Sequence, residues 1–272
     1  MQGRLSPLVN GRIQAFPWLY WVSEFERAAE VGFRLIEWTL DEEFLYQNPL
    51  LTEAGRRLIR ELTLEHRVTV DSLTCDFVMQ SPFWKARGRE KARRERDLMA
   101  VAEACHLADV SLIVIPLVDN GRLEDRRQED LLVGALEHAS GEFLDLGLSV
   151  VFESDLPPSD LARFIGQFDE AVFGINYDIG NSASLGFFPR EELGAYGTRV
   201  RNVHVKDRLL GGGSVPLGDG CADFGSVFSE LAQVGYKGNF ILQTARSETG
   251  DHVEVLTRSR KMTESWIERY GV

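Results

Sequence analysis

Four polar side chains close four successive apolar runs in the second half of the chain: Glu153, Asp178, His204 and Gln243. Two carboxylates, an imidazole and an amide oxygen form a mixed oxygen and nitrogen ligand set, which suits Mn²⁺, Mg²⁺, Co²⁺ or Zn²⁺. We predict a divalent metal site, with Mn²⁺ as the first choice. Taken singly, each residue has an ordinary alternative: a helix N-cap or solvated acid for the carboxylates, a core histidine, and a glutamine that only supports its neighbours by hydrogen bonds.

Two further ionisable residues at the ends of such runs could move a proton. Lys206 follows His204 by two residues, so it shares a face with it if the strand continues, and could act as an acid or stabilise an oxyanion. The alternative for Lys206 is a salt bridge with Asp207 or Glu153. Glu37 could be a proton donor or hold a substrate hydroxyl, and its alternative is a buried, hydrogen-bonded support.

Other residues in corresponding places could bind a substrate. Asp76 and Asp119 are candidate contacts to substrate hydroxyl groups. Arg246 could hold a phosphate or carboxylate through two parallel hydrogen bonds. Trp38 could cover a substrate ring, although packing in the core is the simpler interpretation.

An alternation of strands and helices must position these residues. Short β-branched or apolar runs predict seven strands, at Phe33–Trp38, Val68–Leu73, Leu112–Pro116, Leu148–Glu153, Phe173–Asp178, Val200–Val205 and Asn239–Gln243. Between them lie amphipathic stretches with helical periodicity, among them Ser23–Val31, Thr52–Arg67, Lys91–Ala108, Gln128–Leu146, Pro158–Phe168, Phe224–Val234 and Val253–Tyr270.

With Met1–Leu5 as a possible, shortened first strand, 272 residues divide into eight units of about 34 residues each. Strict alternation implies parallel strands, so we predict an α/β fold: a single-domain (β/α)8 TIM barrel over residues 1–272. The rival is an open doubly wound sheet, but neither G-x-G-x-x-G nor a P-loop motif is present. In a barrel, the glycine-rich loop at 210–220 would lie near the usual phosphate region, either as an anion site or as a plain connector.

Charge and composition limit the partners. The net charge is −12, which opposes binding to nucleic acid or to an anionic membrane, so neither is expected as a partner. The basic run at 85–96 is best explained as a solvated helix face with Glu–Arg pairs at helical spacing. The three cysteines (Cys75, Cys105 and Cys221) form no disulfide framework or metal motif, and we expect a cytoplasmic protein.

The chain resembles the xylose-isomerase-like TIM barrels over essentially its whole length, and most of all the sugar phosphate isomerase/epimerase branch. The segments that carry the resemblance are MQGRLSP at 1–7, GFRLIEW at 32–38, IVIPLVDN at 113–120, VVFESD at 150–155, NYDIGN at 176–181, RNVHVKDR at 201–208, VPLGDGCADF at 215–224 and GNFILQTAR at 238–246.

The resemblance implies metal ligands at Glu153, Asp178, His204 and Gln243, where such proteins carry Glu, Asp, His and Glu. Gln243 is a departure, because an amide can offer an oxygen to a metal but cannot ionise and serve as the second base. Asn181 is another, since many members have a histidine there that contacts substrate or metal. The chain also lacks the apolar residues that precede MQGRL in relatives, so strand one is short or the true start lies upstream.

The resemblance implies a metal-dependent sugar or sugar-phosphate isomerase or epimerase that acts through a metal-stabilised enediolate, with Glu153 as ligand and base. One alternative is a keto-sugar or cyclitol dehydratase, which needs a single base and an acid. Another is a non-catalytic sugar-binding barrel that has lost its second carboxylate. A homodimer or homotetramer is expected from the resemblance, and an endonuclease IV-like activity is disfavoured because no other histidine ends a strand.

Overall fold

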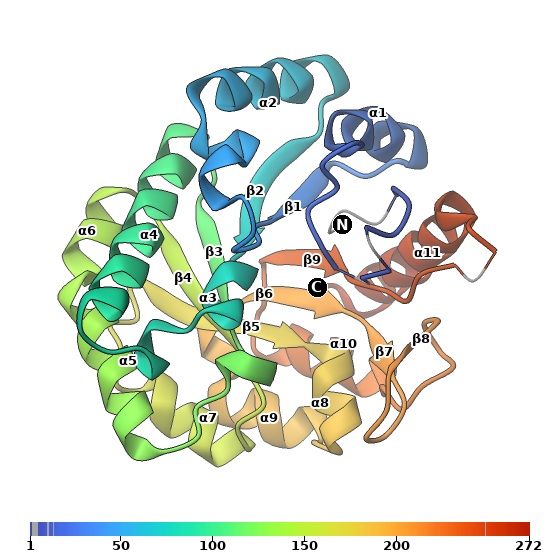
Figure 1. Cartoon of the computed structure of the whole chain (residues 1–272). Coiled ribbons are helices and arrows are strands. Elements are labelled where there is room, and N and C mark those ends of the chain that lie inside the picture. Colours follow the sequence, from blue (N-terminus) through green and yellow to red (C-terminus); the bar gives the residue numbers. More distant parts are fainter. Residues whose placement is uncertain (2–4, 10, 13, 248) are drawn as a thin grey trace.

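The predicted barrel is present. The computed structural model describes residues 1, 5–9, 11–12, 14–247 and 249–272. Seven parallel strands form one sheet in the order β1-β2-β3-β4-β5-β6-β9, which curls into a nearly closed barrel with helices on its outside (Figure 1). The strands are β1 (Leu35–Thr39), β2 (Thr69–Thr74), β3 (Leu112–Leu117), β4 (Ser149–Ser154), β5 (Phe173–Asp178), β6 (Val200–Val205) and β9 (Asn239–Leu242).

The helices that surround the strands agree with the sequence periodicity. They are α1 (Trp21–Val31), α2 (Glu53–His66), α4 (Gly88–Leu107), α5 (Arg126–His138), α6 (Ser140–Asp145), α7 (Pro158–Ile165), α10 (Phe224–Gln233) and α11 (His252–Tyr270). The amphipathic stretch predicted at Gln128–Leu146 is two helices, because the chain turns at Ala139 between α5 and α6. No helix in the described part of the chain is both long and apolar enough to cross a membrane.

Met1, the first residue of the strand predicted at Met1–Leu5, lies beside β1. Of Met1–Leu5, residues 2–4 lie outside the described residues. Met1 itself pairs with β1, since its carbonyl oxygen accepts from the Glu37 amide at 2.7 Å and its amino group donates to the Leu35 carbonyl at 2.8 Å. Met1 therefore lies against the edge of β1 that faces β9, the strand at the other end of the sheet (Figure 1).

Side-chain alternation along the strands separates an apolar layer from a polar interior. Alternate residues of a strand point to opposite faces. Phe152 and Phe173 point outward, where Phe168 packs on both rings at centroid distances of 5.0 and 4.8 Å. Phe152 also packs on Phe164 at 5.2 Å and on Phe173 at 6.1 Å. The inward positions of the same region are polar and buried: Ser72, Thr74, Glu153, Asn176, Asp178, Asn202 and His204.

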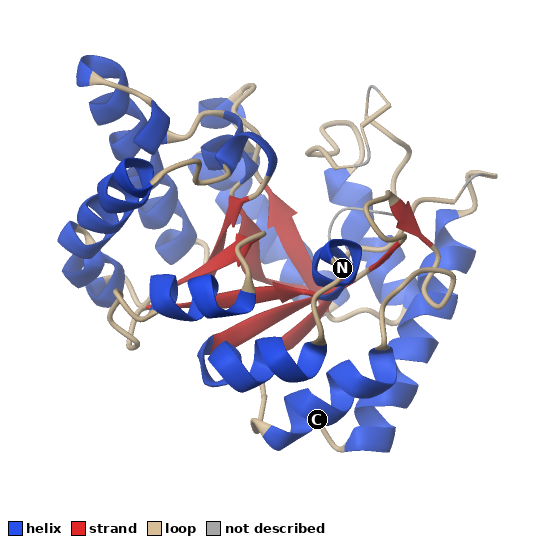
Figure 2. Cartoon of the chain, turned by 90° about the horizontal axis from the view of Figure 1, so that it is seen from below, coloured by secondary structure: helices blue, strands red, loops and turns tan. Residues whose placement is uncertain are grey.

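The loops after the strands contain elements that the sequence patterns did not indicate. They are the helices α3 (Asp76–Gln80), α8 (Ile179–Leu185) and α9 (Pro189–Tyr196), the hairpin of β7 (Asp207–Arg208) and β8 (Ser214–Val215), and the single 3₁₀ turns η1 (Leu45–Gln47), η2 (Pro49–Leu51), η3 (Phe83–Lys85), η4 (Asp119–Gly121) and η5 (Gly197–Arg199). Figure 2 shows the hairpin standing apart from the barrel strands. These elements are short, so hydrophobic periodicity over a long window cannot reveal them.

The basic run forms part of α4, as predicted. Lys91 pairs with Glu95, Arg94 with Glu90 and Arg93 with Asp97, each at the i,i+4 spacing of a helix surface. The positive charges are therefore matched along their own helix.

Candidate active site

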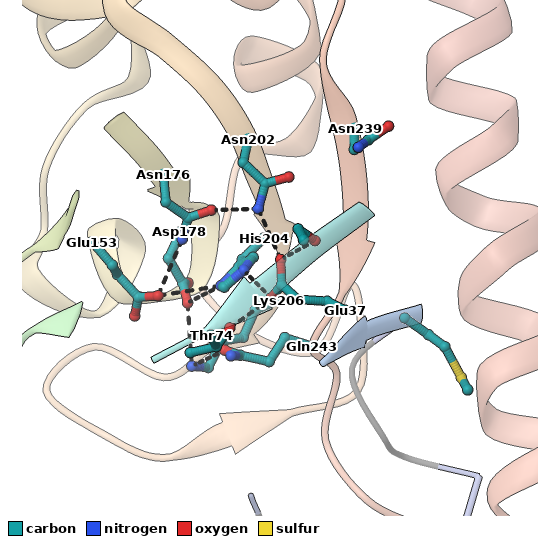
Figure 3. Close-up of polar contacts among 12 residues, drawn as sticks. Glu37, Thr74, Glu153, Asn176, Asp178, Asn202, His204, Lys206, Asn239 and Gln243 are labelled. Atoms are coloured by element: carbon teal, nitrogen blue, oxygen red, sulfur yellow. Dashed lines mark hydrogen bonds and ion pairs between the residues drawn. The ribbon is translucent and has the colours of Figure 1, made fainter. Parts of the chain in front are cut away.

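His204 lies at the centre of the polar interior, with no exposed surface. Its Nε2 is 2.8 Å from Glu37 Oε1, and its Nδ1 faces Glu153 Oε2 at 3.2 Å and Asp178 Oδ2 at 3.9 Å (Figure 3). Burial acts to lower the pKa of His204, but the charge of Glu37 and the hydrogen bonds of Glu153 and Glu37 outweigh it and raise the pKa to about 10. The imidazole is thus held between carboxylates on both of its nitrogens.

Glu37 supports the histidine from below. Besides His204, it accepts hydrogen bonds from Ser72, Thr74 and Asn202 at 2.8, 2.7 and 3.1 Å. Burial acts to raise the pKa of Glu37, yet His204 and these hydrogen bonds lower it overall. Glu37 does not line the cavity described below. The structure therefore places it as the buried support, and the expectation that it faces a substrate needs correction.

Glu153, Asp178 and His204 form a compact, fully buried group whose ligand atoms all lie within 4.8 Å of one another. The amides of Asn181 and Asn176 donate to Glu153 Oε1 and Oε2 at 2.6 and 3.1 Å, and the Asn181 backbone N–H donates to Asp178 Oδ1 at 2.8 Å. The His204 Nδ1 faces Glu153 and Asp178 without a well-aligned hydrogen bond. A cation bound between these groups would displace the Nδ1 proton, and that nitrogen would then serve as a ligand. Two carboxylate oxygens and one imidazole nitrogen fit a divalent metal ion.

Gln243 stands beside this group but is bonded to Lys206. The Lys206 Nζ lies 2.7 Å from Gln243 Oε1 and 3.3 Å from Asp178 Oδ2. A glycine at position 180 avoids a clash with the lysine side chain, since a Cβ at that position would lie 2.7 Å from Lys206 Cγ. Lys206 thus contacts neither Asp207 nor Glu153 as a salt bridge, and the Gln243 oxygen faces an ammonium group.

A cavity of about 480 Å³ opens above this group at the carboxyl ends of the strands. Its walls include six of the residues predicted from the sequence: Asp76, Asp119, Glu153, Asn181, Lys206 and Gln243. Asp178 and His204 lie just beneath. The strand ends converge as expected, because parallel strands of a barrel all point their carboxyl ends to one face.

Two predicted substrate contacts lie elsewhere. Trp38 is buried outside the cavity, with its indole N–H donating to Asn48 Oδ1 at 2.9 Å and its ring 5.0 Å from that of Phe16. Since Glu37 points into the barrel, its neighbour Trp38 must point out, so the core alternative is correct. Arg246 donates from Nη1 to the Ser6 carbonyl oxygen at 2.5 Å and does not line the cavity.

The glycine-rich loop at 210–220 already binds an anion of its own chain. The backbone N–H groups of Gly218 and Gly220 donate to Asp207 Oδ2 at 2.9 and 3.0 Å, and those of Arg208 and Ala222 donate to Oδ1 at 2.9 and 3.1 Å. A Cβ at Gly220 would lie only 2.1 Å from Asp207 Oδ1. The loop is a connector wrapped around a buried carboxylate.

Several cavity residues were not foreseen. Gln14 reaches the cavity from the segment before α1, and Arg122 and Arg208 line it from the loops after β3 and β6. Arg208 donates to Asn181 Oδ1 at 2.8 Å and so supports the amide that holds Glu153. None of the three ends an apolar run, although Arg208 lies two residues after Lys206, within the segment RNVHVKDR that carries the family resemblance.

The fold and the strand-end cavity define a TIM barrel with a candidate active site, and the relatives, which are named as epimerases, place it among enzymes of the isomerase class. The profile described as "Xylose isomerase-like TIM barrel" matches residues 25–266. A curated relative, the L-ribulose-5-phosphate 3-epimerase UlaE of Escherichia coli (strain K12), is 25% identical over 266 residues, which cover 93% of this chain and 92% of that protein.

Solved structures agree on the fold. A D-allulose 3-epimerase from Methylomonas sp. superimposes with a TM-score of 0.75 at 15% identity, over 93% of both chains. An IOLI protein with a binding zinc atom gives a TM-score of 0.73 at 16% identity, over 94% of both chains. This chain belongs to the xylose isomerase-like TIM barrel family.

Proposed function

We propose that this protein is a divalent-metal-dependent isomerase or epimerase of a sugar or sugar phosphate. The observation that carries the proposal is the position of a base and an acid around one cavity. Glu153, held by two amides, and Lys206, held by Gln243, both line the cavity, with Asp178 and His204 beneath them. The 3-epimerases among the relatives support the substrate class.

The metal is part of this proposal. Glu153, Asp178 and His204 would hold it, and Gln243 would become a fourth ligand only if its oxygen exchanged Lys206 for the ion. A cation bound there would polarise a substrate carbonyl and make the adjacent C–H more acidic. Mn²⁺ is the first candidate, with Mg²⁺, Co²⁺ and Zn²⁺ as alternatives, and the zinc in the structure of a relative supports the last of them.

Glu153 is the proposed base, and it would take the proton from the carbon beside the carbonyl. The two amides that hold its oxygens fix the direction of the carboxylate. Lys206 is the proposed acid, and it would supply a proton from its ammonium group, which lies beside Asp178 and Gln243 in the cavity wall. Asn181, Asp76 and Asp119 would contact the substrate hydroxyl groups from the cavity wall.

A dehydratase is the second candidate function, and Gln243 is the observation that favours it. Elimination of water needs one base and one acid, and the described cavity supplies Glu153 and Lys206 without a second strand-end glutamate. Product mass separates the two functions, because isomerisation conserves the mass of the substrate and dehydration lowers it by one water.

Exchange of the substrate's α-proton with solvent tests the proposal. Mn²⁺-loaded protein is incubated in D₂O with L-ribulose 5-phosphate, D-allulose and D-fructose, and proton NMR follows the loss of the α-proton signal. We expect exchange on at least one substrate, its loss in Glu153→Gln, and its retention in Glu192→Gln, a control in which a buried glutamate outside the cavity is replaced. Exchange that survives in Glu153→Gln would rule out its role as the base.

Binding without any exchange would support the third alternative, a sugar-binding barrel without catalysis. A cytoplasmic location and a homodimer or homotetramer remain predictions from the sequence. Sedimentation of the purified protein would test the oligomeric state.

A further inference from the structure

The described residues before α1 are anchored near both ends of their segment, and one of them, Gln14, lines the cavity. We call the described residues within 5–18 the strap. At its start, Ser6 accepts from Arg246, Ser6 donates to Glu24, and Leu5 accepts from Arg27. The start of the strap is thus fixed to α1 and to the loop after β9.

The other end of the strap is fixed beside the cavity. The Phe16 backbone N–H donates to Asp41 Oδ2 at 2.9 Å, and Asp41 also accepts from Gln80, a cavity residue, at 2.8 Å. The Phe16 ring packs on Trp38 at 5.0 Å. Arg246 and Trp38, which were expected to touch a substrate, hold the strap instead.

Between these anchors, Gln14 extends into the cavity and joins two of its walls. Its Nε2 donates to Asp76 Oδ2 at 2.8 Å, and its Oε1 accepts from Gln243 Nε2 at 3.1 Å. A line of hydrogen bonds therefore runs from Lys206 through Gln243 and Gln14 to Asp76. Each amide in this line is oriented by its neighbours, because a carbonyl oxygen can only accept and an amide nitrogen can only donate.

The donors and acceptors along this line could equally form hydrogen bonds with the hydroxyl groups of a polyol. A hydroxyl both donates and accepts, so it can bond to the amide oxygen of one side chain and the amide nitrogen of another. Asp76 is almost completely buried, and burial, followed by the charge of Asp41, raises its pKa well above the usual range. Such a carboxyl can also donate a hydrogen bond once it holds a proton.

We propose that Gln14 is a specificity-determining residue of this site and that, with Asp76, it binds one hydroxyl group of the sugar on the side of the cavity away from Glu153. This inference rests on the proposed function, since it names a residue that recognises a hydroxyl group of the substrate bound at the same site. It adds a group from outside the barrel strands to the binding machinery.

Steady-state kinetics and calorimetry of Gln14→Ala test the inference, with Arg12→Ala as the matched control, because Arg12 is an exposed residue of the same strap. The substrates are D-allulose, L-ribulose 5-phosphate, D-fructose, and D-fructose analogues that lack O4, O5 or O6. Thermal unfolding of each variant establishes that it is folded.

We expect Gln14→Ala to raise KM about tenfold, the usual effect of one lost hydrogen bond, with a much smaller change in kcat. One deoxy analogue should bind wild type about as weakly as Gln14→Ala binds the parent sugar, and should lose nothing further in the variant. Arg12→Ala should match wild type throughout.

Equal losses on the parent sugar and on every deoxy analogue would overturn the inference and leave Gln14 a structural link. Wild-type kinetics in Gln14→Ala would overturn it as well, while the α-proton exchange would still support the proposed function. Gln14-dependent binding of these sugars without exchange would support the inference and reject the proposed function. If calorimetry shows no binding to wild type, both are wrong.

Discussion

The ammonium nitrogen of Lys206 lies 2.7 Å from the side-chain oxygen of Gln243, at the position where the family resemblance led us to expect a second glutamate. An amide oxygen accepts a hydrogen bond from the lysine without cancelling its positive charge. A glutamate at the same place would form an ion pair with it. The exchange of Glu for Gln therefore removes one acidic group from the site and leaves Lys206, which lines the cavity, paired with the carboxylate of Asp178 at 3.3 Å.

The first prediction concerns the charge at position 243. Gln243→Glu should bind Mn²⁺ or Zn²⁺ at least about tenfold more tightly, because a further carboxylate near the ion strengthens its attraction. Isothermal titration calorimetry of the metal-free protein measures this. Gln243→Ala is the control, since it removes the amide and adds no charge. Unchanged or weaker metal binding in Gln243→Glu would show that the new carboxylate forms an ion pair with Lys206 and does not bind the metal.

The second prediction concerns the buried support of His204. Glu37→Gln removes the charge that faces Nε2, so the free energy of unfolding should fall by about 3 kcal/mol, as it does when one partner of a buried ion pair is removed. Metal affinity should fall about 10- to 100-fold, because a ligand histidine depends on the partner of its second nitrogen. Urea unfolding and calorimetry measure the two effects.

Ser72→Ala provides the comparison for Glu37, because it removes a single hydrogen bond to that carboxylate and should cost only about 1 kcal/mol. If Glu37→Gln weakens neither stability nor metal binding more than Ser72→Ala does, Glu37 is not the group that positions the histidine.

The sequence allowed most of the barrel to be predicted, because parallel strands and amphipathic helices leave long periodic signals. Glu153, Asp178 and His204 followed from the same signal, since each ends a strand and all strand ends meet. Trp38 could have been placed correctly by alternation, because it follows the inward-pointing Glu37. Gln14 could not have been found, since its position depends on how the strap is anchored at Asp41, Glu24 and Arg246, and no sequence pattern links these residues to Gln14.

A buried carboxylate that holds a loop gives the third prediction. Asp207 accepts four backbone N–H groups from residues 208 to 222. Asp207→Ala leaves these donors unpaired, so we expect a loss of about 3 kcal/mol or more of unfolding free energy. Amide hydrogen exchange should become faster at Gly218, Gly220 and Ala222. Unchanged protection at these three amides, compared with wild type, would contradict the role of Asp207 as the centre of the loop.

The fourth prediction concerns Glu192, which lies buried outside the cavity and accepts hydrogen bonds from Tyr177, Tyr196 and Ser182. Burial raises its pKa, although those hydrogen bonds act to lower it. A carboxyl with a raised pKa in the folded state keeps its proton there at pH values where the unfolded chain has lost it. Its contribution to stability is therefore greatest below the unfolded pKa of about 4.5 and falls as the pH rises toward the folded pKa.

Glu192→Gln cannot titrate, so the stability of wild type relative to this variant should decline as the pH rises above about 4.5 and then level off. Urea unfolding of the two metal-free proteins between about pH 4.5 and pH 8 measures the difference. A difference that stays constant over this range, or one that grows in favour of wild type, would mean that the folded protein does not retain the Glu192 proton.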